Sequence, residues 1–156
     1  MKHIVSCAII WLAMPLVVLA SDNLKLSLRK MNWNVAGEQW ISLVFRNSSE
    51  APIELEIPVE GSGFCDKYFE VEAVTKEGTP AKRGMMYAPA PEPYAVRLRP
   101  GGIYVHLIQP HAYLNNVRVE TLEKIRVRYA NPLTKTTVLS EWLILTPNKN
   151  DVQKGR

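Results

Sequence analysis

Apolar and polar side chains alternate along most of this chain, and that period of two limits its possible folds more than any other feature. Such alternation is typical of a β-strand that turns one face to a core and the other to water. Turn-forming residues separate the alternating runs, for example at 47–49 and 100–102. Helical spacing is weak throughout, apart from a short turn expected near 113–116. The alternating runs lie at 24–29, 40–45, 53–57, 69–73, 96–99, 103–108, 124–129 and 138–145. We therefore expect an all-β sandwich of about eight strands.

Two of these runs carry more specific expectations. The run 40–45 is apolar on both faces, which predicts a strand in the middle of its sheet. In the run 103–108 we expect the aliphatic residues Ile103, Val105 and Leu107 to face the core, which places His106 on the outer face. Trp40 and Trp142 are also expected in the core.

The first twenty residues have the pattern of a secretory signal peptide. Lys2 precedes an apolar run over 4–19, and Val18-Leu19-Ala20 provides small residues for cleavage. A membrane anchor is the alternative, but the run is short for a span and contains Pro15. We therefore expect a signal peptide over 1–20, a sandwich domain over 21–146 and a polar tail over 147–156. The mature chain would be periplasmic or secreted, with no membrane span, 156 − 20 = 136 residues and a net charge of 18 − 15 = +3.

Cys65 would be the single cysteine of the mature chain, so it cannot form an internal disulfide. A buried structural thiol, a bridge to a second chain and a reactive group remain as alternatives. Lys67 is close in sequence but no histidine is, and a nucleophilic cysteine needs a neighbouring base. We do not expect catalysis at Cys65.

The titratable residues form no pattern typical of an enzyme or a cofactor site. Only His106 and His111 remain after cleavage, too few for a zinc site, so we expect no metal. No nucleophile elbow or paired carboxylates occur at a recognisable spacing, so we expect no enzyme activity and no cofactor.

A basic stripe runs along the strand at 124–129. It is either a solvated strand face, whose cations could pair with acidic residues on neighbouring strands, or a surface that contacts an acidic partner protein. Nucleic acid is not expected as a partner, because the net charge is modest and no aromatic residues interleave with the cations. The basic residues are Lys124, Arg126 and Arg128, with Arg97 and Arg99 on another strand, and the acidic residues are Glu54, Glu56, Glu70 and Glu72.

The segment 82–94 is the most unusual stretch of the chain. Prolines at alternate positions favour an extended conformation, and methionine and tyrosine are enriched at protein interfaces. A stiff loop of this kind loses little entropy when it docks. We predict partner contacts there, although a crossover that tucks its apolar residues under the sandwich is the alternative. The predicted contact residues are Met85, Met86, Tyr87, Pro89, Pro91 and Tyr94.

The order of strand and turn motifs between Leu24 and Tyr129 carries a family resemblance. The motifs are Phe45-Arg46-Asn47-Ser48-Ser49, Ala51-Pro52-Ile53-Glu54-Leu55, Tyr68-Phe69-Glu70-Val71, Glu77-Gly78-Thr79-Pro80-Ala81-Lys82-Arg83-Gly84, Val96-Arg97-Leu98-Arg99-Pro100-Gly101-Gly102 and Ile125-Arg126-Val127-Arg128-Tyr129. This order resembles the immunoglobulin-like propeptide and inhibitor domains of the deuterolysin-type metalloprotease group. The resemblance implies a single immunoglobulin-like sandwich that acts in trans on a protease, because no zinc-binding protease helix follows the domain.

Together these features predict an exported, non-catalytic protein-binding module of the proteinase-inhibitor type. Its partner would be another exported protein, and the resemblance points to a metalloprotease. The alternative is a structural or assembly subunit of the cell envelope that binds partners through sheet edges. A glycan-binding module that uses Trp33 and Trp40 also remains open.

Overall fold

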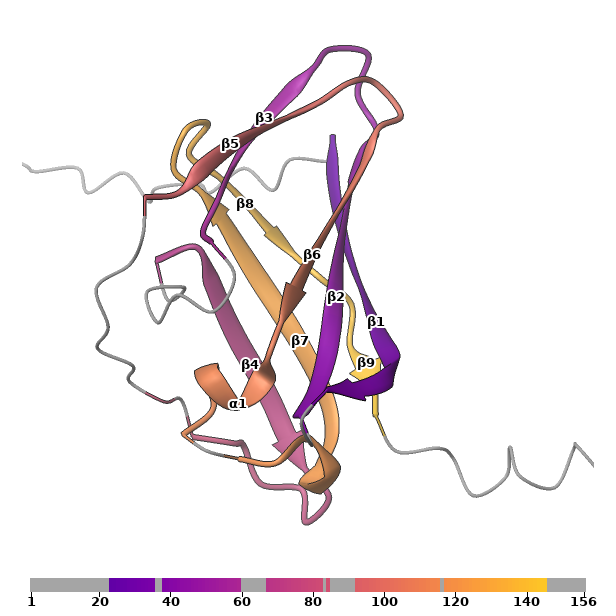
Figure 1. Ribbon diagram of the computed structural model, residues 1–156, viewed down its shortest axis with the longest axis vertical. Coiled ribbons are helices and arrows are strands. Elements are labelled where there is room, and N and C mark those ends of the chain that lie inside the picture. Colours follow the sequence, from indigo (N-terminus) through magenta and orange to yellow (C-terminus); the bar gives the residue numbers. More distant parts are fainter. Residues whose placement is uncertain are drawn as a thin grey trace, which may run out of the picture.

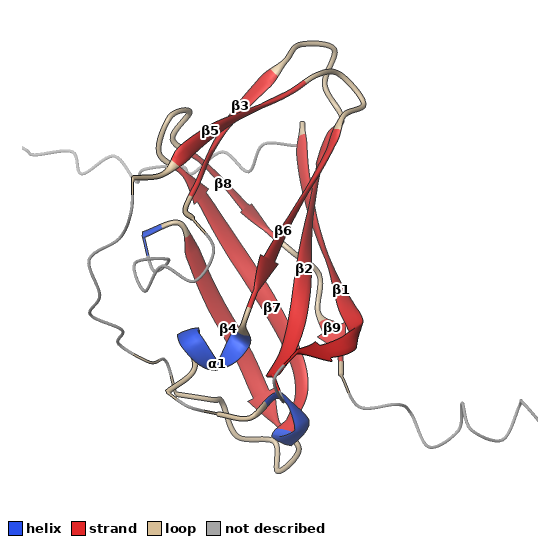
Figure 2. Cartoon of the chain, viewed as in Figure 1, coloured by secondary structure: helices blue, strands red, loops and turns tan. Residues whose placement is uncertain are grey.

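The computed structural model describes residues 23–35, 38–59, 67–82, 84, 92–115 and 117–145, and we call these the described residues. Strands dominate their regular structure (Figure 2). The helices α1 (Pro110–Tyr113) and a 3-10 helix over Val119–Thr121 are short. The chain is therefore an all-β protein, which confirms the prediction from the alternating pattern. Among the described residues, no helix is both long and apolar enough to cross a membrane.

The first sheet holds three antiparallel strands in the order β1-β2-β6. They are β1 (Leu24–Val35), β2 (Glu38–Asn47) and β6 (Ile103–Ile108). The central place of β2 confirms the prediction made from its two apolar faces. Its inward residues Ile41, Leu43 and Phe45 are fully buried.

The second sheet holds β4 (Phe69–Thr75), β7 (Leu122–Asn131), β8 (Thr136–Leu139) and β9 (Leu143–Ile144), with β7 paired to the other three. The single last strand predicted over 138–145 is wrong in detail, because it is divided around Ser140 into β8 and β9. The hydroxyl of Ser140 accepts the main-chain N–H of Val127 at 3.0 Å, and the Ser140 N–H donates to the Val127 carbonyl at 2.9 Å. The described residues thus form nine strands, and two of them share one predicted run.

The two sheets pack face to face around one core (Figure 1). The strand orders β1-β2-β6 and β4-β7-β8 correspond to the orders A-B-E and C-F-G of an immunoglobulin-type sandwich, and β3 and β5 lie outside both sheets. The immunoglobulin-like arrangement that was expected is present in this strand order.

A separate pair of strands, β3 (Ile53–Ile57) and β5 (Tyr94–Leu98), extends the ribbon of β2 and β6 beyond the first sheet. This pair crosses toward the second sheet (Figure 1). Side chains of β7 hold it there, because the Tyr129 hydroxyl donates to the Glu56 carbonyl at 2.9 Å and the Asn131 amide donates to the Glu54 carbonyl at 2.7 Å. These β3 carbonyls are therefore satisfied without a further strand.

Asn47 organises the bend between the ribbon and the first sheet. Its fully buried side-chain amide donates to the carbonyls of Ala51 at 2.8 Å and Leu98 at 3.1 Å, and its Oδ1 accepts the Ser49 N–H and hydroxyl. The facing turn closes with the Gly102 N–H donating to the Arg99 carbonyl, and Gly101 has a φ of 70° that glycine adopts without strain. The bend is thus fixed by specific hydrogen bonds on both strands.

Aromatic rings fill the core between the sheets, and they overturn the predicted orientation of β6. The His106 ring stacks on Phe69 with centroids 5.4 Å apart and planes inclined by 19°, and Phe69 and Tyr129 both contact Phe45. His106 is 1% exposed, so burial lowers its pKa to about 4 and keeps it neutral. The rings of β6 therefore face inward, and the aliphatic side chains that we expected in the core face outward.

Candidate protein-binding surface

The loop predicted to bind a partner lies largely outside the described residues. This holds for Met85, Met86, Tyr87, Pro89 and Pro91, and also for Cys65. Tyr94 is described, and it begins β5 opposite Ile57. Its side chain is 41% exposed, and its hydroxyl lies 2.6 Å from the Tyr104 hydroxyl. The structure thus places Tyr94 at the surface near β6.

The two histidines of the expected mature chain do not share a site. His106 is buried in the aromatic core, and His111 lies in α1. Within the described ranges, no three His, Cys, Asp or Glu side chains are grouped so that they could hold a metal ion.

The two arginines of the basic stripe on β7 pair with carboxylates of the neighbouring strand β4, whereas Lys124 lies against the Trp142 ring. Arg126 contacts Glu72 at 2.6 Å through Nη2, and Arg128 contacts Glu70 at 2.9 Å through Nη1. These cross-strand pairs confirm the interpretation that acidic residues of an adjacent strand balance the cations. This sheet face therefore presents little unbalanced positive charge to a partner.

Trp142 is not a core residue, so that prediction was wrong. Its half-buried ring lies over the charged groups of Lys124 and Arg126, with 5.2 and 4.6 Å to the ring centroid. The break between β8 and β9 places it on the outer face, where a cation can stack on its ring. Trp40 is also only half-buried, and the Trp33 side chain lies outside the described set.

Among the described side chains of the first sheet, the outer side of β6 carries the most exposed apolar row. Ile103 is 60% exposed and Val105 is 50% exposed, while Leu107 and the neighbouring Val44 of β2 are half-buried. Together Val44, Ile103, Val105 and Leu107 form a surface that we call the β6 edge. The prediction from sequence missed it because it assigned these aliphatic residues to the core.

β6 ends its sheet, since none of the described strands pairs with its second side. Its sequence Ile-Tyr-Val-His-Leu-Ile contains no Lys, Arg, Asp, Glu or Pro, although proteins usually protect edge strands with such residues. The edge strand β4 carries Glu70 and Glu72, and β1 carries Lys25 and Arg29. Four-residue β8 is also uncharged, but it lies close to β1. This uncharged run was the sequence signal that could have revealed the edge.

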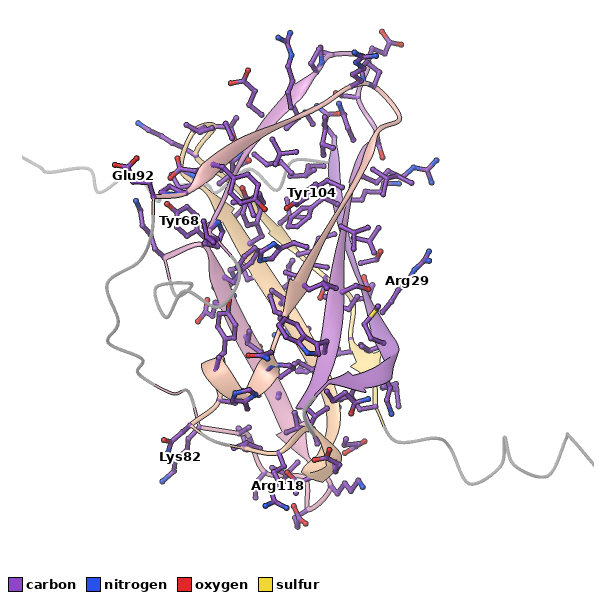
Figure 3. All side chains as sticks on the ribbon, viewed as in Figure 1. Arg29, Tyr68, Lys82, Glu92, Tyr104 and Arg118 are labelled. Atoms are coloured by element: carbon purple, nitrogen blue, oxygen red, sulfur yellow. The ribbon has the colours of Figure 1, made fainter. Side chains whose placement is uncertain are left out.

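Cations lie beside the β6 edge on the same face of the sheet. The cross-strand register places Lys25, Arg46 and Ile103 in one row, and Arg29, Ser42 and Leu107 in another. Arg29 extends away from the sandwich, whereas Tyr104 lies within its outline (Figure 3). In the described part of the chain, no carboxylate lies within ion-pair distance of the three cations. This face is therefore apolar along one strand and positive beside it.

A groove of about 420 Å³ lies at the Ile103 end of this face. Two of the cations, Lys25 and Arg46, line it together with Asn47 and Gly101 from the bend. Ser48 and Ser49 complete its lining. The groove therefore combines positive charge with a main chain that is hydrogen-bonded between Asn47, Gly101 and Gly102.

No protein-family model matches this chain, and no curated protein matches it. Its own surface therefore carries the information on function: an uncharged edge strand, cations beside it and a polar groove at one end.

Proposed function

We propose that this chain is a non-catalytic binding module whose strand β6 accepts an extended segment of another exported protein. The single observation that carries the proposal is that an end strand without charged residues exposes Ile103 and Val105 to solvent. An added strand would hydrogen-bond to main-chain groups on the side of β6 that no described strand pairs with, and would contact the apolar row with its side chains. The expected signal peptide supports a partner in the periplasm or outside the cell.

The exposed apolar area is large enough to matter for binding. Burying a whole aliphatic side chain stabilises by about 1.5–3 kcal/mol, so covering the exposed parts of Ile103 and Val105 contributes on the order of 1 kcal/mol each. Main-chain hydrogen bonds along β6 add affinity without demanding one particular partner sequence. These features favour the assembly-type alternative, in which a sheet edge does the binding.

The test compares two matched lysine variants of the purified protein. Val105→Lys places a charge on the β6 edge, and Leu139→Lys places one on the uncharged strand β8, where Leu139 is 44% exposed. The immobilised wild type and both variants are incubated with the exported proteins of the producing cells. We expect one partner to be retained by the wild type and by Leu139→Lys but lost with Val105→Lys.

Hydrogen exchange on the captured complex locates the contact. The amides of β6 should exchange more slowly in the complex than in the unbound protein, since strand addition protects them. Equal retention by Val105→Lys, unchanged exchange in β6 or the absence of any captured partner would each contradict the proposal.

A proteinase inhibitor is the second candidate function, and the exposure of Tyr94 favours it. Tyr94 closes the proline-rich segment 82–94 and keeps 41% of its surface exposed. An exposed tyrosine at the first position of a strand is an effective anchor in a partner's pocket. The resemblance to metalloprotease propeptide domains names the protease class, and inhibition of an exported metalloprotease by the purified protein is the direct test.

A further inference from the structure

Two positive charges lie side by side in the groove of about 420 Å³, which we call the cationic groove. Lys25 of β1 and Arg46 of β2 are direct register partners, so both side chains leave the same face of the sheet. Residues opposed in this way have Cβ atoms about 4.5–5.5 Å apart, and like charges at such positions are destabilising. The fold therefore retains a repulsive pair that a bound anion would relieve. The cationic groove is lined by Lys25, Arg46, Asn47, Ser48, Ser49 and Gly101.

No described carboxylate balances this pair of cations. Glu50 directly follows the lining segment 46–49, but its side chain is exposed and does not line the groove. Within the described ranges it forms no ion pair with Lys25 or Arg46. The lining thus holds two cations and no acidic side chain.

The rest of the lining is polar. It contains no apolar side chain, so the groove offers nothing to a hydrophobic ligand. Ser48 is exposed, and its hydroxyl makes no hydrogen bond to the other described residues. This hydroxyl is therefore available as a neutral donor beside the two charged ones.

Hydrogen bonds hold the wall of the cationic groove without a ligand. The main chain of Asn47 bonds to Gly101 and Gly102 with both N–O distances at 3.0 Å, and the Ser48 N–H donates to the Asn23 carbonyl at 2.7 Å. The buried Asn47 amide adds bonds through its nitrogen and its oxygen. Binding would therefore have to order mainly the two cationic side chains, which limits its entropic cost.

The charge of the groove selects among possible anions. A phosphate monoester such as phosphoserine carries a charge of about −1.5 to −2 at pH 7 and three strong acceptor oxygens. It matches two cations and a hydroxyl better than a carboxylate, which has one negative charge and two oxygens. Arginine binds phosphate through two parallel hydrogen bonds, and lysine binds it as a point charge.

We infer that the cationic groove binds a phosphate monoester, with Arg46 and Lys25 as charged donors and the Ser48 hydroxyl as a third donor. Its volume lies in the range of small-molecule sites, about 300–1,000 Å³, which leaves room for a polar carrier such as glycerol beside the phosphate. The inference goes beyond the proposed strand addition, because the groove lies on the side of β1 and β2 and not at the outer side of β6.

A titration of the purified protein with glycerol 3-phosphate, followed by nuclear magnetic resonance, tests the site. We expect the amide signals of Ser48 and Gly101 to shift and to saturate. Acetate at the same ionic strength should bind about tenfold more weakly, since it offers fewer charge-assisted hydrogen bonds.

Two arginine variants supply the matched comparison. Arg46→Gln should weaken the binding of glycerol 3-phosphate about tenfold, because it removes charge-assisted bonds. Arg29→Gln changes the net charge equally on the same sheet face, but Arg29 lies four residues from Lys25. That is about 13 Å along β1, more than the Debye length of about 10 Å in 0.1 M salt, so binding should stay within about twofold. Both side chains are exposed, and both variants should melt within about 3 °C of the wild type.

A second probe distinguishes a soluble phosphate from a lipid headgroup. The wild type and both variants are sedimented with phosphatidylcholine vesicles that contain or lack phosphatidic acid. Binding that requires both phosphatidic acid and Arg46 supports the site with a lipid as its source, and binding of glycerol 3-phosphate alone supports it with a soluble source.

Three results would overturn the inference. They are failure of both phosphate probes to bind, equal affinity for glycerol 3-phosphate and acetate, and equal weakening by Arg46→Gln and Arg29→Gln. Each would leave the proposed strand addition standing, because that proposal is tested by Val105→Lys on β6.

Discussion

The side-chain amide nitrogen of Asn47 donates a hydrogen bond of 3.1 Å to the main-chain carbonyl of Leu98, 51 residues further along the chain. This bond joins the end of β2 to the end of β5 at the bend where the ribbon leaves the first sheet. It helps to determine how β3 and β5 cross toward β7, and Asn47 itself lines one wall of the cationic groove. One buried amide thus links the packing of the sandwich to its candidate binding surface.

Asn47→Ala should lower the free energy of unfolding by about 2–4 kcal/mol. The substitution leaves the buried Leu98 carbonyl without its donor, which costs about 1–3 kcal/mol, and it removes the partly buried bonds to Ala51 and Ser49, which contribute about 0.5–1.5 kcal/mol each. Urea denaturation measures the loss. Ser49→Ala is the control, since its hydroxyl makes partly exposed bonds and its removal should cost less than about 1 kcal/mol. A loss below about 1 kcal/mol for Asn47→Ala would show that the bend does not depend on this amide.

Stability should fall as the pH decreases from 6.5 toward 4, because of His106. Burial lowers the pKa of His106 from 6.5 to about 4, so the unfolded state binds the proton first. The free energy of unfolding therefore has its full value above about pH 6.5. It falls progressively on acidification, by about 2 kcal/mol at pH 5.

His106→Phe isolates this effect, since phenylalanine can stack on Phe69 without titrating. Urea denaturation at pH 7 and pH 5 should show a clearly smaller pH dependence for the variant than for the wild type. Parallel losses in both proteins would assign the acid sensitivity to other groups.

Removing the acidic partners of the β7 stripe should create a polyanion-binding face. In the double variant Glu70→Gln and Glu72→Gln, Arg126 and Arg128 lose their ion pairs, so the protein should elute from heparin at higher salt. Stability should change by less than about 1 kcal/mol, because these pairs are partly exposed. The double variant Glu92→Gln and Glu120→Gln has the same net charge and both positions are exposed. Identical elution of the two variants would mean that net charge, not the stripe, governs retention.

The double variant Met86→Ala and Tyr87→Ala tests the inhibitor candidate. If this segment contacts a protease, its affinity for that protease should fall about tenfold or more while the melting temperature stays within about 2 °C. Calorimetry of binding and thermal unfolding together provide both values, and Leu133→Ala, at an exposed turn, serves as the control. A large drop in melting temperature with unchanged binding would instead identify these residues as part of the core.

Local pattern was sufficient to locate most strands of this protein. The predicted runs 53–57 and 103–108 coincide with β3 and β6 at both ends, and the two apolar faces of 40–45 predicted the central position of β2. The reason is that alternation depends only on neighbouring residues and on which of them avoid water. Cross-strand pairing of Glu70 and Glu72 with Arg126 and Arg128 followed from the same reasoning about neighbouring strands.

Only the tertiary structure decided which face of β6 is buried. The sequence Ile-Tyr-Val-His-Leu-Ile alternates in either orientation, and both faces contain residues that a core can accept. The choice depends on the opposite sheet, where the ring of Phe69 provides a stacking partner for His106 and leaves Ile103 and Val105 outside. The tertiary structure also determined the position of the Trp142 side chain, because the break at Ser140 places its ring over Arg126 on the outer face. A period of two defines two faces, and the packing against a second sheet selects between them.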